Sequence, residues 1–223
     1  SACITCWLPI PAPAAPLLDA MCRRITWNGA PGKCSVVGNN FGLAAVGPAD
    51  AIGAFELGDL RIAFHGHGFW RERDDAGMSP REVCVRLADA YRRLGPDALS
   101  LVGGDFALAL IDTSRQQALL AVDRMGVRNV VYRHEQDVLT FAATLDALAA
   151  FPHASHRVSP QALYDYVYFH MVPGPTTIFE GSLRLLPGHY LLARPGRIAE
   201  LYRYAREAPT AFSAMVPASS RTV

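Results

Sequence analysis

Several features are scarce in this chain of 223 residues, and each scarcity excludes a class of protein. Lysine occurs once, at Lys33, and the 21 basic residues nearly balance the 20 acidic residues, which leaves a net charge of +1. No strong electrostatic field therefore draws the chain to nucleic acid or to an anionic membrane surface. The apolar stretch from Leu8 to Leu18 is interrupted by prolines, so no membrane-spanning segment is expected.

Cysteine is also sparse. The five cysteines are scattered and odd in number, and no secretory signal precedes them, so we expect reduced thiols in the cytoplasm rather than a disulfide framework. Cys3 and Cys6 form a Cys-x-x-Cys pair, but a zinc site needs a second pair of ligands, and none follows. We therefore predict no metal site and no cofactor bound by this chain.

The hydrophobic fraction of 51% is large enough for a sizeable core. Short apolar segments between turn residues predict strands. They span Cys3–Leu8, Cys34–Val37, Gly42–Val46, Leu60–Phe64, Phe106–Ile111, Ala118–Val122, Asn129–Tyr132, Val138–Ala142, Tyr190–Ala193 and Ile198–Tyr204. Because most connections are short, the sheets are predicted to be antiparallel.

Helical periodicity and capping residues predict four helices. Three of them are Leu17–Arg24, Leu145–Ala150 and Ser159–His170. The fourth begins at the cap Ser79 with Pro80 and ends at Gly95-Pro96. The helix Ser159–His170 has an apolar face with Leu163, Tyr166, Val167 and Phe169. The resulting expectation is an α+β layered domain over residues 1–205. Residues 206–223 are predicted to be a tail or the start of a linker.

Several ordered motifs occupy the second half of the chain. They are Leu101–Asp112, the loop Asp123-Arg124-Met125-Gly126-Val127-Arg128, Tyr132 at the end of a strand, Phe141-Ala142-Ala143, the segment Pro173–Phe179 and the segment Leu186-Pro187-Gly188-His189-Tyr190. In this order, from about residue 60 to residue 204, they resemble the glutaminase domain of the asparagine synthetases, which are class II glutamine amidotransferases. The resemblance implies an Ntn-hydrolase fold, a four-layer αββα sandwich of two antiparallel sheets. A plainer interpretation of Asp123-Arg124 is a turn ion pair, and of Pro187-Gly188 a type II turn.

The resemblance also implies where glutamine would be hydrolysed. A glutaminase of this class uses an N-terminal cysteine whose own amino group is the base. Here Ser1 and Ala2 precede Cys3, and aligning Ile4 with the family's Cys-Gly-Ile places Ala2 at the nucleophile. Cys3 is thus a weak candidate nucleophile, and a small strand residue is the favoured interpretation.

The remaining family positions are also altered. The Asn-Gly pair that forms the oxyanion hole at a strand end corresponds to His65-Gly66. The arginine that holds the α-carboxylate of glutamine falls in the strand with Ala44 and Ala45, and the acid that holds its amine corresponds to Pro80 or Arg81. Losing a bidentate arginine contact and a charged partner would cost several kcal/mol of substrate binding.

Other chemistries are less well supported. His65 and His67 suggest a metal pair or a general base, but no carboxylate pair accompanies them, and a structural role is favoured. Gly103-Gly104-Asp105-Phe106 resembles a nucleotide-cyclase signature, yet Ala107 stands where an acid is needed. A Gly-x-Ser-x-Gly segment is absent, which leaves serine hydrolysis unsupported.

Three functional hypotheses follow. The first is a non-catalytic glutaminase-like domain that supports a synthetase domain, as in the lasso-peptide cyclases and β-lactam synthetases that this pattern resembles. The Ser-Gly-Gly-x-Asp-Ser loop of such a synthetase does not occur in the 223 residues. ATP and Mg²⁺ would therefore bind to a synthetase domain in the same longer chain or in a separate subunit. The substrate would be a peptide or a small molecule. The second is an active glutamine amidotransferase with Cys3 exposed by processing. The third is a stand-alone binding or scaffolding module.

Overall fold

The computed structural model describes residues 2–6, 14–25, 32–39, 41–72, 75–135, 138–152, 156–197 and 199–205, with backbone only for 2–6 and 75–76. The segment 206–223, predicted to be a tail or the start of a linker, lies outside this part. Within the described part, no helix has both the length and the apolar character needed to cross a membrane.

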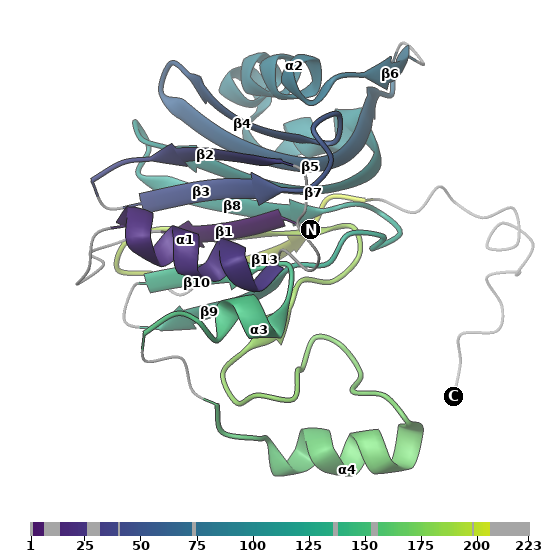
Figure 1. The fold of residues 1–223 in the computed structure, drawn as a ribbon. Coiled ribbons are helices and arrows are strands. Elements are labelled where there is room, and N and C mark those ends of the chain that lie inside the picture. The colour runs from purple at the N-terminus through teal and green to yellow at the C-terminus, as the bar shows by residue number, and fades with distance from the viewer. Residues whose placement is uncertain are drawn as a thin grey trace, which may run out of the picture.

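Two sheets stack face to face, and all their strand pairs are antiparallel (Figure 1). The first sheet has the order β11 (Leu183–Arg184), β9 (Val131–Glu135), β10 (Val138–Ala142), β1 (Ala2–Cys6), β3 (Phe41–Val46) and β2 (Lys33–Val37). The second has the order β13 (Glu200–Arg203), β12 (His189–Ala193), β8 (Gln117–Val122), β7 (Val102–Asp112), β5 (Leu60–Trp70) and β4 (Ile52–Leu57), with β6 (Asp75–Met78) beside β5.

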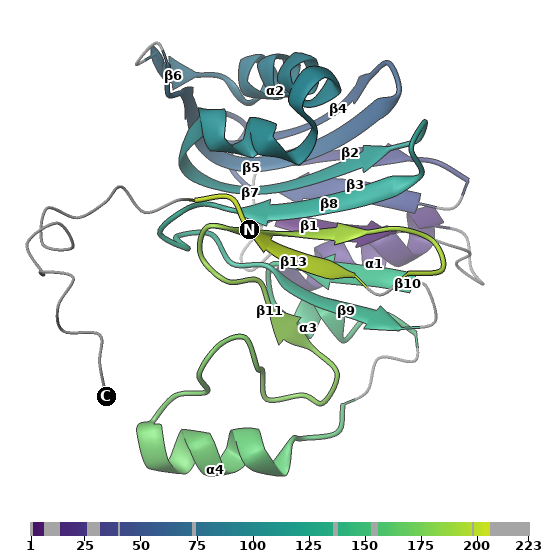
Figure 2. The same ribbon diagram turned by 180° about the vertical axis from the view of Figure 1, so that it is seen from behind.

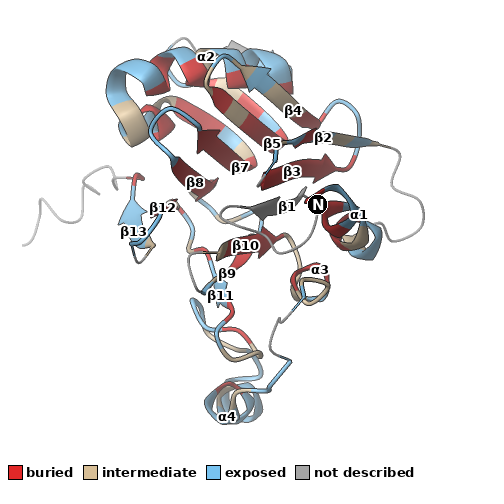
Figure 3. Cartoon of the chain, turned by 90° about the vertical axis from the view of Figure 1, so that its left-hand side faces the viewer, coloured by how far each residue is buried: buried red, intermediate tan, exposed pale blue. Residues whose placement is uncertain are grey.

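Helices cover the outer face of each sheet. α1 (Ala14–Ile25) and α3 (Leu145–Leu148) lie on the first sheet, where Leu18, Met21 and Leu148 join a buried cluster with residues of β3, β9 and β10. α2 (Pro80–Leu94), followed by the 3-10 helix η1 (Gly95–Leu101), lies on the second sheet. The predicted four-layer αββα sandwich of two antiparallel sheets is therefore confirmed (Figure 3).

The central core lies between the sheets. It contains Leu43, Leu120 and Phe141, which come from both sheets and are at most 1% exposed. Because each strand turns alternate side chains to opposite faces, these sheets bury apolar residues both between the layers and under the helices. This explains why β3 and β8 are buried at every position.

Some predicted elements needed correction. β4 was not predicted, since Gly53, Ala54 and Glu56 are poor strand residues, but it pairs along its whole length with β5. The strand predicted to end at Phe64 continues to Trp70, because β7 supplies hydrogen-bonding partners as far as Val102.

α4 (Pro160–Phe169) confirms the last predicted helix, but its apolar face is not packed against the body. Of its residues only Ala162 is buried. Figure 2 shows α4 at the edge of the molecule, beyond the first sheet, as Figure 1 does from the opposite side.

Candidate functional site

His65 and Gly66, predicted at the oxyanion position, lie inside β5 rather than at its end. The strand continues because His65 pairs with Ala107 and Gly66 with Phe106 on β7. Gly66 has a φ of +132°, and its N–H donates to the carbonyl oxygen of Ala51 at 2.7 Å. The amide of Gly66 is thus already satisfied by the backbone.

The imidazole of His65 is 3% exposed and faces a cation. Its Nε2 lies 3.4 Å from Nη1 of Arg128. Because a guanidinium can only donate, Nε2 is the acceptor in this contact. Burial is the largest cause that lowers the pKa of His65 to about 3, and the positive charges of the N-terminal amino group and of Arg128 add to it. The ring is therefore neutral at physiological pH.

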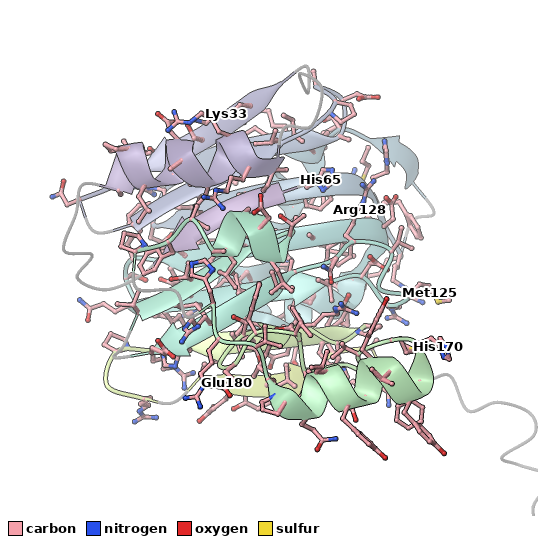
Figure 4. All side chains as sticks on the ribbon, turned by 60° about the horizontal axis from the view of Figure 1, so that its bottom comes forward. Lys33, His65, Met125, Arg128, His170 and Glu180 are labelled. Carbon is pink, nitrogen blue, oxygen red and sulfur yellow. The ribbon has the colours of Figure 1, made fainter. Side chains whose placement is uncertain are left out.

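Arg128 in turn is held by a carboxylate. Its Nε and Nη2 lie 2.9 and 2.5 Å from Oδ2 of Asp105, the residue paired with His67 in the β5–β7 register. Nδ1 of His67 lies 3.5 Å from the other oxygen of Asp105. Figure 4 shows His65 and Arg128 next to each other at this end of the sheets. The site is therefore a linked set of His65, Arg128, Asp105 and His67.

Asp123 shapes the loop that delivers Arg128. Its carboxylate, on a residue 1% exposed, accepts hydrogen bonds from the backbone N–H groups of Met125, Val127 and Arg128 at 2.9 to 3.1 Å. The suggested Asp123-Arg124 ion pair is not found among the described side chains, because Asp123 binds backbone amides instead. The N–H of Gly188 donates to the Asp123 carbonyl oxygen at 2.8 Å. The two motifs around Asp123 and Pro187-Gly188 thus meet in space.

The predicted nucleophile and carboxylate positions lie side by side in the first sheet. Cys3 pairs with Ala44, and Ala2 pairs with Ala45. Ala44 and Ala45 are 0% exposed. β3 leads into Gly47, where an added Cβ would lie 3.4 Å from Nε2 of His65. The sheet register thus brings these positions to the same region as His65.

Arg81 lies in the first turn of α2, at the predicted amine-binding position. Its guanidinium lies over the ring of Phe55, 5.6 Å from the ring centroid, which is the geometry of a cation–π contact. Pro80 is buried against β4, 3.4 Å from where a Cβ of Gly53 would stand. Neither side chain supplies the carboxylate that the family uses at this position.

The sequence interpretation missed the roles of Asp105 and Arg128. Arg128 was seen only as part of a loop, and Asp105 only as part of the motifs Leu101–Asp112 and Gly103-Gly104-Asp105-Phe106. One signal was available: Asp105 is a charged residue at the head of the apolar run Phe106–Ile111, and a charge at such a position usually has a partner. Its partner comes from a different hairpin connection and could not be identified from spacing.

A comparison with protein-family models identifies the family. Residues 72–205, more than half of the chain, match the family model described as a glutamine amidotransferase domain. The chain belongs to the glutamine amidotransferase domain family.

Individual relatives are longer than this chain. It is 32% identical over 128 residues to amidase chry2 of Gibberella zeae, a match that covers 57% of this chain and 18% of that protein. It is 30% identical over 136 residues to asparagine synthetase [glutamine-hydrolyzing] 3 of Bacillus subtilis, covering 60% of this chain and 21% of that protein. The matched part of the chain thus covers about a fifth of the length of these relatives.

Among solved structures, the glutamine phosphoribosylpyrophosphate amidotransferase of B. subtilis is similar over 77% of this chain and 36% of that one, with 14% identity and a TM-score of 0.46. This likeness is too low to carry a conclusion about function.

Proposed function

We propose that this chain is a non-catalytic glutaminase-like domain of an ATP-dependent, amide-forming ligase of the asparagine synthetase family, and that it supports a synthetase domain. The main support for the proposal is that the hydrogen-bonding groups of His65 and Gly66, at the oxyanion position, already have partners within the chain. An oxyanion hole needs donors aimed at the place where negative charge develops. The Gly66 N–H is instead bound to Ala51 O at 2.7 Å, and the buried Nε2 of His65 accepts from Arg128.

The substrate-binding positions support the same conclusion. A glutaminase needs a cation for the α-carboxylate of glutamine, but Ala44 and Ala45 are buried alanines. The guanidinium of Arg128 contacts His65, and Asp105 already engages that guanidinium through two hydrogen bonds. A glutamine carboxylate would have to displace Asp105 from Arg128, which is costly in a partly buried site.

The synthetase domain would supply the chemistry. In the lasso-peptide cyclases and β-lactam synthetases, which the pattern resembles, a retained glutaminase half accompanies a domain that activates a carboxylate with ATP. An amine of the substrate itself then replaces ammonia. No residue of the present chain is assigned to ATP or Mg²⁺. The amidase and asparagine synthetase relatives, by their names, also act on amide bonds.

Glutamine hydrolysis tests the proposal. Ammonia release from L-glutamine would be measured for the chain alone and together with the polypeptide that carries the Ser-Gly-Gly-x-Asp-Ser loop, since a partner can complete an active site. We expect release no faster than the buffer background in both cases. Hydrolysis that disappears in Cys3→Ala would show an active glutaminase and would refute the proposal. Mass spectrometry of the N-terminus would show in the same samples whether Cys3 has become the first residue.

A further inference from the structure

α4 presents most of its large side chains to water. Leu163, Tyr164, Tyr166, Val167, Tyr168 and Phe169 are between 51% and 72% exposed. Met171, just after the helix, is 57% exposed. Only Ala162 of the helix is buried. An exposed apolar surface of this kind usually marks a protein interface.

The exposed helix is nevertheless held in one position. The N–H of Ser159, its N-cap, donates to the carbonyl oxygen of Ile178 at 2.9 Å, and Val158 forms an antiparallel bridge with Phe179. The Ser159 hydroxyl accepts from the N–H of Ala162 at 3.2 Å. A helix of 10 residues is marginal in water without packing. The helix is thus anchored at its start, while its apolar side chains remain exposed to solvent. These are the properties of a surface that a binding partner covers.

A groove of about 550 Å³ lies between α4, α3 and the segment that leads to β11. Leu145, Leu163, Tyr166, Met171 and Ile178 make it apolar, and Arg184 contributes a charge. Among the described residues, no carboxylate pairs with the guanidinium of Arg184. The groove therefore matches an apolar group that carries or adjoins a negative charge.

The size of the exposed surface indicates a macromolecular occupant. A small molecule in the groove would leave the aromatic residues outside it in water. Tyr164 and Tyr168 stack with ring centroids 6.2 Å apart, and Phe169 meets Tyr168 edge to face at 4.8 Å. None of these three lines the groove. Aromatic residues of this kind form the centres of protein interfaces.

A second copy of this chain fits less well, because Arg184 would need a carboxylate from it. Asp165 of α4 accepts from Gln161 at 2.8 Å, and Glu180 of the neighbouring loop pairs with Arg157 at 3.4 Å. Asp165 and Glu180 thus already have partners on their own chain.

We infer that α4 and its groove form the surface on which the synthetase domain docks, with an apolar side chain of that domain in the groove and a carboxylate opposite Arg184. This inference rests on the proposed function for the existence of the synthetase domain. It adds the surface and the chemistry of the contact.

The test measures binding of this chain to the polypeptide with the Ser-Gly-Gly-x-Asp-Ser loop, taken from the same or the neighbouring reading frame. Val167→Glu places a charge on α4 at a side chain that is 72% exposed, and it should weaken binding by about tenfold or more. Val85→Glu is the matched control: Val85 is also an exposed valine on a helix, 38% exposed on α2, and its substitution should leave the Kd unchanged. Unchanged urea midpoints would show that both variants fold.

Arg184→Glu tests the charge. It should weaken binding at low salt, and the difference from the wild-type chain should shrink as salt is added. Hydrogen exchange on the complex should show new protection over residues 160–171.

The outcomes separate the two proposals. A complex that Val167→Glu leaves intact, with protection elsewhere, overturns this inference and leaves the proposed function standing. Glutamine hydrolysis by the complex overturns the proposed function alone, and the absence of any complex overturns both. Sedimentation of the chain alone tests whether a second copy of this chain binds the surface instead. A dimer that Val167→Glu abolishes would assign the surface to a second copy and overturn the inference.

Discussion

At the scale of single residues, the site depends on two glycines that allow β5 and β7 to approach closely. Gly66 has a φ of +132° and Gly104 a φ of +106°. An added Cβ would lie 1.9 Å from the carbonyl oxygen of Asp105 at Gly66, and 2.0 Å from that of His67 at Gly104. Both distances are far below any tolerated contact, and both conformations are unfavourable for other residues. The positions of His67 and Asp105 therefore depend on these glycines.

Substituting Gly66 tests this dependence. Gly66→Ala should cost more than about 4 kcal/mol of unfolding free energy or prevent folding, because strain and a backbone clash add. Gly77→Ala is the control, since Gly77 has a φ of +84° with nothing within 4 Å of the added Cβ; it should cost only about 1 kcal/mol. Equal urea midpoints for the two variants would contradict the close approach.

The low pKa of His65 makes stability depend on pH. The ring is neutral in the folded protein down to a pKa of about 3, whereas the unfolded chain takes up the proton near pH 6.5. The unfolded state therefore binds more protons between these values, and stability falls as pH drops below 6.5. By pH 5 the loss should be about 2 kcal/mol.

Urea denaturation of the wild-type chain and of His65→Asn at pH 7.5 and pH 5 would measure this loss. The variant has no titrating ring, so its unfolding free energy should fall by about 2 kcal/mol less than that of the wild type. The same pH dependence in both proteins would show that His65 is not the group responsible.

At the scale of elements, α2 and α4 begin alike but differ in what they pack against. α2 has a capping box: Ser79 accepts from the N–H of Glu82 at 3.3 Å, and Glu82 accepts from the N–H of Ser79 at 2.8 Å. Its Val83, Leu87 and Tyr91 are at most 1% exposed. α4 also has a serine cap, but it is bare. Capping and periodicity predict that a helix forms. They do not predict whether its apolar face packs against the body of the protein, as in α2, or stays exposed to solvent, as in α4.

This difference predicts unequal effects of removing the caps. Ser79→Ala should lower the unfolding free energy by about 1 kcal/mol, because α2 folds together with the core. Ser159→Ala should change the global value by less than about 0.5 kcal/mol while speeding amide exchange along residues 160–169. Urea denaturation and hydrogen exchange would measure both. An equal global loss for both variants would show that α4 is part of the cooperative core.

At the scale of the whole molecule, the layer between the sheets is one of the buried clusters that stabilise the sandwich. Phe141 of β10 is 1% exposed and belongs to the cluster that joins both sheets. α4 lies outside this layer (Figure 3), and its aromatic side chains Tyr164, Tyr166, Tyr168 and Phe169 are more than half exposed. The molecule thus combines a densely packed body with one bare helix.

Truncating an aromatic ring in each region tests this division. Phe141→Ala should cost about 3 to 5 kcal/mol through lost burial and a cavity. Tyr164→Ala, which removes a ring that is 63% exposed, should change the unfolding free energy by less than about 0.5 kcal/mol. Thermal or urea denaturation measures both, and a large loss at Tyr164 would mean that α4 packs against the body in solution.

Much of the fold could be predicted, because hydrophobic alternation and capping are local signals. β10 was predicted with the bounds Val138–Ala142, and α2 with its capping serine at Ser79. β4 was missed because its glycine, alanine and glutamate have low strand propensity and only pairing with β5 makes it a strand. β5 was predicted too short for a related reason, since Gly66 and Gly68 are strand residues only beside β7.

The candidate site was predictable in position but not in its contacts. By itself the sequence determined the family motifs, the order of the elements and the altered residues at His65, Ala44 and Arg81. Only the tertiary structure decided that Asp105 holds Arg128 against His65, that Gly66 is bound to Ala51, and that α4 is bare. The physical reason is that periodicity and capping act between neighbours in sequence, whereas hydrogen-bond partners and burial depend on segments that are distant in sequence and meet only in the folded chain.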